Sequence, residues 1–285
     1  MKKLFTFLFI GSMIASCSND ELNEVNEPET AVDLETQVAE GLYDNSNLGI
    51  YEGVFTTLDG KQRATVLIEM NGKDNPLVAF GFPDGQLKSF RSDAKASKAS
   101  DDAIQFSGED FSFDFSVEED GSNPIVSNAI YMGKEGDVVI VKETSKAAVE
   151  TKTGTYRCLN GCEDHPDLGK GGTQTFNSIA TSDGMGNGAD FILQVTLKNE
   201  VFPGTMTQTN CVANGRGATT CDLSGTIQGG SGPADVTGEH TYDNDNIEQF
   251  EDCSTLRGQW VYDSAWFGES SLVFESDSAS GEECI

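Results

Sequence analysis

Basic residues are scarce in this chain of 285 residues. It holds 18 Lys and Arg against 47 Asp and Glu, which gives a formal net charge of -29. Binding to nucleic acid depends on Lys and Arg that displace counterions from phosphates, so a polyanion of this size is repelled by DNA and RNA. The composition therefore excludes a nucleic-acid partner. It is compatible with bound divalent cations but does not locate them.

Histidine is scarce too, since the chain has only His165 and His240. A Ser-His-Asp hydrolase needs one of them as its base, but His165 lies in a cysteine-rich turn and His240 within a predicted strand. The glycine-rich run around Ser231 lacks the Gly-x-Ser-x-Gly spacing. Glycoside hydrolysis needs two carboxylates at a set separation, and the many acids single out no pair. The sequence therefore assigns no catalytic residue.

Long apolar runs are absent beyond the first residues, MKKLFTFLFIGSMIASC. The run from Leu4 to Ile14 has 11 residues, fewer than the roughly 20 that cross a bilayer. Two lysines precede it and small residues follow it, a pattern typical of a cleaved signal peptide over residues 1–16.

The four residues Ile14-Ala15-Ser16-Cys17 resemble the lipobox of bacterial lipoproteins. That resemblance implies cleavage before Cys17, a diacylglycerol on its sulfur and an acyl chain such as palmitate on its new amino group. The acidic residues directly after Cys17 are similar to export signals of some Bacteroidota lipoproteins. The resemblance thus implies a protein lipid-anchored in the outer membrane that faces the cell surface, or otherwise the periplasm. An ordinary secretory signal with a nearby cysteine stays open as the alternative.

Residues 18–47 contain nine acids and no Lys or Arg. Such a segment repels itself and has few apolar residues to bury, so residues 17–47 are predicted to form a lipidated, disordered tether. The folded part is expected to begin near residue 48.

From Gly49 onward, short runs of β-forming residues alternate with Gly, Asp, Asn and Ser turns. The clearest is Phe111-Ser112-Phe113-Asp114-Phe115, whose period of two places three rings on one face of a strand. The spacing of these runs predicts an all-β protein of antiparallel sandwich or barrel modules. Residues 88–98 gather positive charge and are predicted to form a loop, with an anionic partner as the alternative.

The polar stretch from Glu143 to Thr153 is predicted to link two modules, an N-terminal all-β domain over residues 48–145 and a C-terminal one over residues 146–285. Cysteine is absent between Cys17 and Cys158, and six cysteines follow. In an exported chain these predict three disulfides that staple the second module. Proximity favours Cys158 with Cys162, Cys211 with Cys221, and Cys253 with Cys284. Zinc at Cys158, Cys162 and His165 stays open, although the spacing is unusual.

Both tryptophans lie in one aromatic cluster near the C-terminus. On a strand, Trp260 and Tyr262 share a face, and with Trp266 they could stack on sugar rings, or they could form core.

Acidic turns offer the oxygen ligands that calcium prefers. The best candidate comprises Asp243, Asp245 and Glu248, with a solvated acidic turn as the alternative. Calcium is therefore the one cofactor to test.

These features together favour a lipid-anchored, extracytoplasmic, non-catalytic binding or structural protein. Its expected partners are the membrane, through the lipid, and a glycan or another surface protein. The alternatives are a surface hydrolase that acts on glycans with paired carboxylates, and a calcium-stabilised carbohydrate-binding module.

Overall fold

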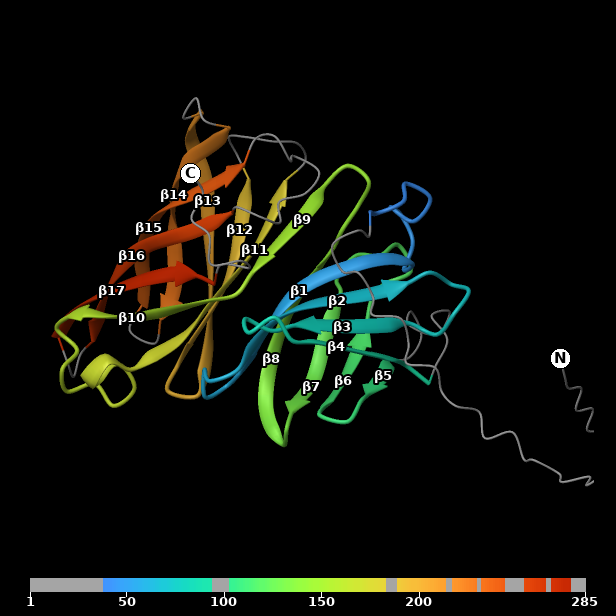
Figure 1. Ribbon diagram of the computed structural model, residues 1–285, viewed down its shortest axis with the longest axis horizontal. Coiled ribbons are helices and arrows are strands. Elements are labelled where there is room, and N and C mark those ends of the chain that lie inside the picture. The colour runs from blue at the N-terminus through green and yellow to red at the C-terminus, as the bar shows by residue number, and fades with distance from the viewer. Residues whose placement is uncertain are drawn as a thin grey trace, which may run out of the picture. The chain divides into compact units, whose positions relative to one another are not determined.

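The computed structural model describes residues 38–93, 103–182, 189–213, 217–229, 232–243, 254–264 and 268–277. Within these ranges the chain consists mainly of antiparallel strands (Figure 1). In the described part of the chain, no helix has the length and apolar character needed to cross a bilayer.

The first sheet has eight strands in the order β4-β3-β2-β1-β8-β7-β6-β5. Neighbours in sequence pair as hairpins, except β4 and β5, which stand at the two ends of this order, and β8 returns to pair with β1. The bounds are β1 Gly49–Thr57, β2 Arg63–Met70, β3 Leu77–Gly81, β4 Leu87–Arg91, β5 Ile104–Ser107, β6 Phe111–Ser116, β7 Ile125–Tyr131 and β8 Lys134–Lys142.

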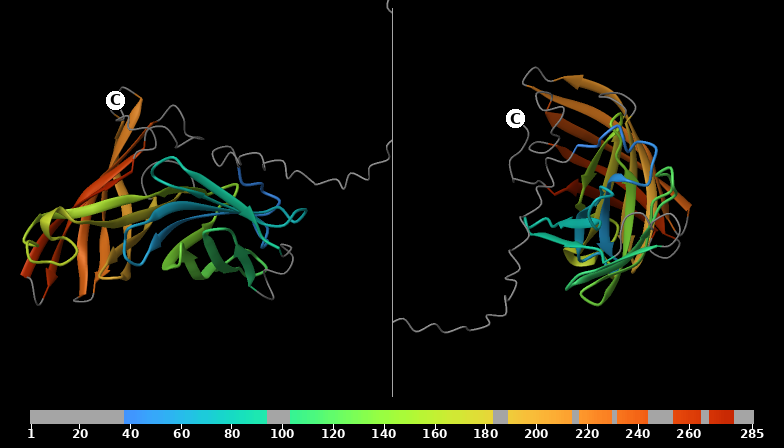
Figure 2. Two further views of the ribbon diagram at one scale, coloured as in Figure 1. Left: turned by 60° about the horizontal axis from the view of Figure 1, so that its bottom comes forward. Right: turned by 90° about the vertical axis from the view of Figure 1, so that its right-hand side faces the viewer.

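The second sheet has nine strands in the order β10-β17-β16-β15-β14-β13-β12-β11-β9, and β10 also pairs with β11. The strands from β10 to β17 therefore close into a barrel, and β9 extends the edge of β11. The bounds are β9 Ala148–Lys152, β10 Gly154–Asn160, β11 Thr173–Ser182, β12 Asp190–Leu197, β13 Glu200–Ala213, β14 Ala218–Gly229, β15 Gly232–Asp243, β16 Thr255–Ser264 and β17 Gly268–Ser276. The turned views show the curvature of both sheets (Figure 2).

Aromatic rings fill the core of the first sheet. Phe111, Phe113 and Phe115 are all buried on the inward face of β6, as their alternation predicts. Phe80 of β3 stacks on Phe111 with ring centroids 3.8 Å apart, and Phe106 of β5 stacks on Phe113 at 4.8 Å. Burial of rings from three strands on one face explains why this sheet curls around them.

Side chains of the second sheet contact the first. Asn177 of β11 donates from Nδ2 to the carbonyl of Phe55 at 3.1 Å, and Gln194 of β12 donates to the Oδ2 of Asp137 at 2.8 Å. Thr175 donates to the carbonyl of Gly60 at 3.1 Å. These contacts are buried or half-buried, so the outward face of β11 and β12 is not a solvent face.

The predicted all-β class of antiparallel barrel or sandwich modules is confirmed, and two details are corrected. Residues 143–153 are not wholly a linker, because Ala148–Lys152 forms β9 and joins the second sheet. Residues 88–98 are not wholly a loop, because Leu87–Arg91 forms β4. Both stretches are polar, and each forms a strand because its backbone pairs with a neighbouring strand, β9 with β11 and β4 with β3.

Candidate functional site

A group of polar side chains meets inside the barrel, at the end where β9 lies. The group comprises Glu150 and Lys152 of β9, Gln208 of β13, His240 of β15 and Ser254, which directly precedes β16. We call it the Glu150 cluster. The members that lie on strands project inward because inward and outward side chains alternate along each strand.

His240 is the centre of the Glu150 cluster. Its Nδ1 lies 2.7 Å from the Oε1 of Gln208, and its Nε2 lies 2.8 Å from the Oγ of Ser254. The hydroxyl of Ser254 donates to the Oε1 of Glu150 at 2.6 Å. The Phe191 ring packs edge-on against the imidazole, with centroids 5.4 Å apart. Every polar atom of the imidazole is therefore bonded, and the ring is held in one orientation.

Charge is concentrated around Glu150, whose side chain is only 9 % exposed. The Nζ of Lys152 lies 3.1 Å from its Oε1, and the Nε2 of His240 lies 3.5 Å from its Oε2. Burial by itself would raise the pKa of Glu150, but the charges of Lys152 and His240, with the hydrogen bonds from His240 and Ser254, hold that pKa well below its usual range.

Ser254, His240 and Gln208 have the spacing of a nucleophile, a base and a group that orients the base. In a working set of this kind the serine hydroxyl donates to the imidazole. Here the hydroxyl donates to Glu150 instead. Ser254 is also only 6 % exposed. The arrangement is that of a satisfied buried network rather than of an activated serine.

A second pair of acids lies on the first sheet, where Glu52 of β1 hydrogen-bonds to Glu143, the residue after β8. Burial raises the pKa of Glu143, and the bond from Glu52 opposes that rise. Hydrogen-bonded carboxyls lie closer together than the roughly 5 to 9.5 Å that glycoside hydrolysis requires. This pair therefore does not have the separation of a glycosidase centre.

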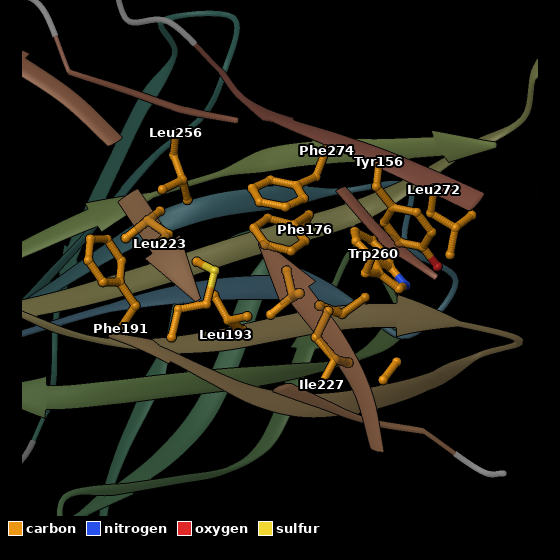
Figure 3. Packing of buried hydrophobic residues seen from close by; sticks show 14 of the residues in the cluster. Tyr156, Phe176, Phe191, Leu193, Leu223, Ile227, Leu256, Trp260, Leu272 and Phe274 are labelled. Carbon is orange, nitrogen blue, oxygen red and sulfur yellow. The ribbon is translucent and has the colours of Figure 1, made fainter. Parts of the chain in front are cut away.

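Trp260, one of the predicted sugar-stacking residues, projects into the barrel and is 5 % exposed. Its ring lies 4.6 Å from that of Tyr156, 5.7 Å from Phe176 and 5.9 Å from Phe274 (Figure 3). Trp260 therefore lies in the core of the barrel, which was the alternative to a sugar-stacking role. Tyr262 is on β16 but its side chain is not described, and Trp266 lies outside the described residues.

The predicted calcium ligands lie at the edge of the described chain or beyond it. Asp243 ends β15 without a described side chain, and Asp245 and Glu248 fall outside the described residues. Within the part of the chain that the structure describes, no group of three or more His, Cys, Asp or Glu side chains is placed to hold a metal.

Two of the three predicted disulfides are present, joining Cys158 to Cys162 and Cys211 to Cys221. The first bond leaves no thiolate for zinc in that turn. His165 is buried there, its Nδ1 accepts from the Asp167 amide at 3.2 Å, and burial lowers its pKa.

The remaining predicted pair, Cys253 with Cys284, lies outside the described residues, as does Cys17.

Sequence reasoning did not find the Glu150 cluster. Alternation along VTGEHTY could have placed His240 on the same face as Val236. Nothing in the sequence relates Glu150 or Gln208 to it, because neither β9 nor β13 pairs directly with β15 and the three strands come together only in the folded sheet.

Comparison of the chain with protein-family models, with curated proteins and with solved structures gives no match.

Proposed function

We propose that this chain is a lipid-anchored, extracytoplasmic binding protein that is displayed on an acidic tether and has no catalysis of its own. The leader, the Cys17 lipobox and the acidic segment support the anchor and its tether. The expected location is the outer membrane, with the folded part facing the cell surface.

The observation that carries the proposal is a row of exposed polar side chains across five adjacent strands of the barrel. Cross-strand pairing places Asp190, Thr207, Ser224, Thr237 and Gln259 side by side, from β12 to β16. All five are exposed. We call them the polar row.

The polar row suits a ligand rich in hydroxyls, such as a glycan. Neighbouring strands lie about 4.8 Å apart, so the row offers regularly spaced donors and acceptors. Thr205 and Thr209 flank Thr207 on the same face of β13 and are exposed as well. Thr207 itself donates to Asp190 at 3.1 Å, which orders that end of the row.

The two acidic sites of the described chain do not favour the alternative of a hydrolase. In the Glu150 cluster the Ser254 hydroxyl donates its hydrogen bond to a carboxylate and not to the imidazole. The hydrogen-bonded carboxyls of Glu52 and Glu143 lie closer together than the two carboxyls of a glycosidase. The alternative of a calcium-stabilised module rests on residues outside the described ranges.

A binding test on an array of bacterial and plant polysaccharides distinguishes these possibilities. We expect the mature protein to retain one or more glycans, and Ser224→Arg to abolish that binding because the long cation covers the centre of the polar row. Ser127→Arg is the matched control, since Ser127 is exposed on β7 of the other sheet. Equal binding by both variants would place the ligand elsewhere, and release of reducing sugar ends with time would establish an enzyme.

A further inference from the structure

We infer that the Glu150 cluster is an acid-sensitive latch, in which the Glu150 carboxylate fastens β9 to β15 and to the start of β16 and releases it when protonated. This inference concerns the inside of the barrel and does not depend on any ligand of the polar row. It rests on the number of protons available to the cluster and on the balance of its charges.

The protons can be counted from the hydrogen bonds. Ser254 has one hydroxyl hydrogen and donates it to Glu150 at 2.6 Å. The Nε2 of His240 lies 2.8 Å from the Oγ of Ser254, which has no second hydrogen to give, so Nε2 must be the donor in that bond. The Nδ1 of His240 faces the Oε1 of Gln208, an amide oxygen that can only accept. Both ring nitrogens therefore carry hydrogen, and His240 is an imidazolium.

The charges balance around a single carboxylate. Glu150 is the anion of the cluster, and Lys152 and His240 are its two cations. Tyr242, next to His240 in space, is a neutral phenol whose pKa burial raises.

The groups opposite the charged residues on the neighbouring strands carry no charge. Ala180 and Ser178 of β11 face Glu150 and Lys152, and disulfide-bonded Cys221 of β14 and Leu256 of β16 face His240. From β12, Phe191 packs on the imidazole, and from β13, the Oε1 of Gln208 accepts a hydrogen bond from it. Protonation of Glu150 thus leaves two buried cations together without their anion.

The direction of the pH effect follows from the position of the Glu150 pKa below its usual value. A carboxylate with a lowered pKa contributes stability at pH values above about 4.3, its unfolded pKa, and that contribution is lost as the pH falls toward the folded pKa.

Strand β9 responds first because of its position at the end of the sheet. It has five residues and pairs with β11 alone among the described strands, whereas barrel strands such as β16 pair on both sides. Once Glu150 is neutral, β9 is held by its hydrogen bonds to β11 and by Val149, which packs with Val54 and Ile179. Local opening is still cheaper than unfolding of the barrel.

Hydrogen exchange followed by mass spectrometry tests the latch on the full mature protein. In the wild type we expect the amides of residues 148–152 to be protected near neutral pH. As the pH falls from about 4 toward about 2 they should lose protection, after correction for the intrinsic exchange rate, while β12 to β14 stay protected. In Glu150→Gln, exchange of residues 148–152 should be roughly a hundredfold faster already at neutral pH, because a buried charge has lost its partner.

Glu239→Gln is the matched control, since Glu239 lies on β15 one residue from His240 but pairs on the outside with Arg257. It should leave exchange of β9 unchanged. The wild-type arm needs no variant to fold. Unchanged protection of β9 at the lower pH, or simultaneous loss of protection in all strands, would overturn the latch. A neutral imidazole, detected for His240 by nitrogen NMR near neutral pH, would overturn the proton count and the latch with it.

Discussion

The guanidinium of Arg63 donates hydrogen bonds to both carboxylate oxygens of Asp277, from Nε and Nη2 at 2.6 Å each. The two residues are 214 positions apart in the sequence. Asp277 also accepts from the hydroxyl of Thr153 at 2.7 Å, and its amide donates to the Thr153 carbonyl. A residue of β2 is thus tied to the end of β17 and to the junction of β9 and β10. The two sheets are joined by this pair as well as by the buried amides of Asn177 and Gln194.

Replacement of Asp277 by Asn should destabilise the folded chain. The change removes a charge from a bidentate pair whose side chains are only 19 % and 23 % exposed, so we expect a loss of roughly 2 kcal/mol in the free energy of unfolding by urea. Arg257 and Glu239 form the comparison pair, at 67 % and 49 % exposure. Glu239→Gln should cost less than about 1 kcal/mol. Equal losses from the two variants would mean that the Arg63 pair contributes no more than a surface contact.

Glu143→Gln should stabilise the protein near neutral pH by about 1 kcal/mol. Burial raises the pKa of Glu143, and among the described residues its Oε2 has no hydrogen-bond partner. A group with a raised pKa contributes most to the stability of the folded protein at low pH, and that contribution is lost as the pH rises through the folded pKa. The advantage of the variant should therefore shrink on acidification. Thermal unfolding of both proteins between about pH 4 and pH 8 measures this, and an advantage that grows in acid would contradict it.

Phe113→Ala should destabilise the first sheet strongly. Phe113 is 3 % exposed and stacks on Phe106, and truncation of a buried ring leaves a cavity that costs roughly 3 to 5 kcal/mol. The neighbouring Ser112→Ala is the control, because Ser112 points to the other face of β6 and should change stability by less than about 0.5 kcal/mol. Urea unfolding followed by fluorescence distinguishes the two variants, and similar midpoints would refute the assigned faces.

Removal of the disulfides should weaken the second module according to the length of each loop. The bond between Cys211 and Cys221 spans 10 positions and that between Cys158 and Cys162 spans 4. The chain-entropy model gives roughly 3 and 2 kcal/mol for paired Cys→Ser variants.

Mass spectrometry of the non-reduced protein checks the pairing directly, and it also tests the predicted bond of Cys253 with Cys284. Free thiols at Cys158 and Cys162 would contradict the structure and reopen the zinc alternative.

The strands that the sequence predicts well are those whose two faces differ. Alternation of Phe111, Phe113 and Phe115 with polar residues marks β6 because one face meets an aromatic core. By contrast β9 is hidden in a polar stretch, since Glu150 and Lys152 project into the barrel and bind other polar groups there. A polar residue buried against a polar partner leaves the same sequence pattern as a solvent-exposed one.

The sequence by itself determined the acidic charge, a pattern typical of a leader with a lipobox resemblance, the all-β class and the two close cysteine pairs that the structure describes, because each depends on composition or on residues near one another in the chain. Only the tertiary structure decided that Glu150 meets Ser254, 104 positions away, and that Trp260 packs into the core. The physical reason is that period-two alternation states which face of a strand a residue occupies. Which strands then confront one another across the barrel depends on how the sheet pairs and closes.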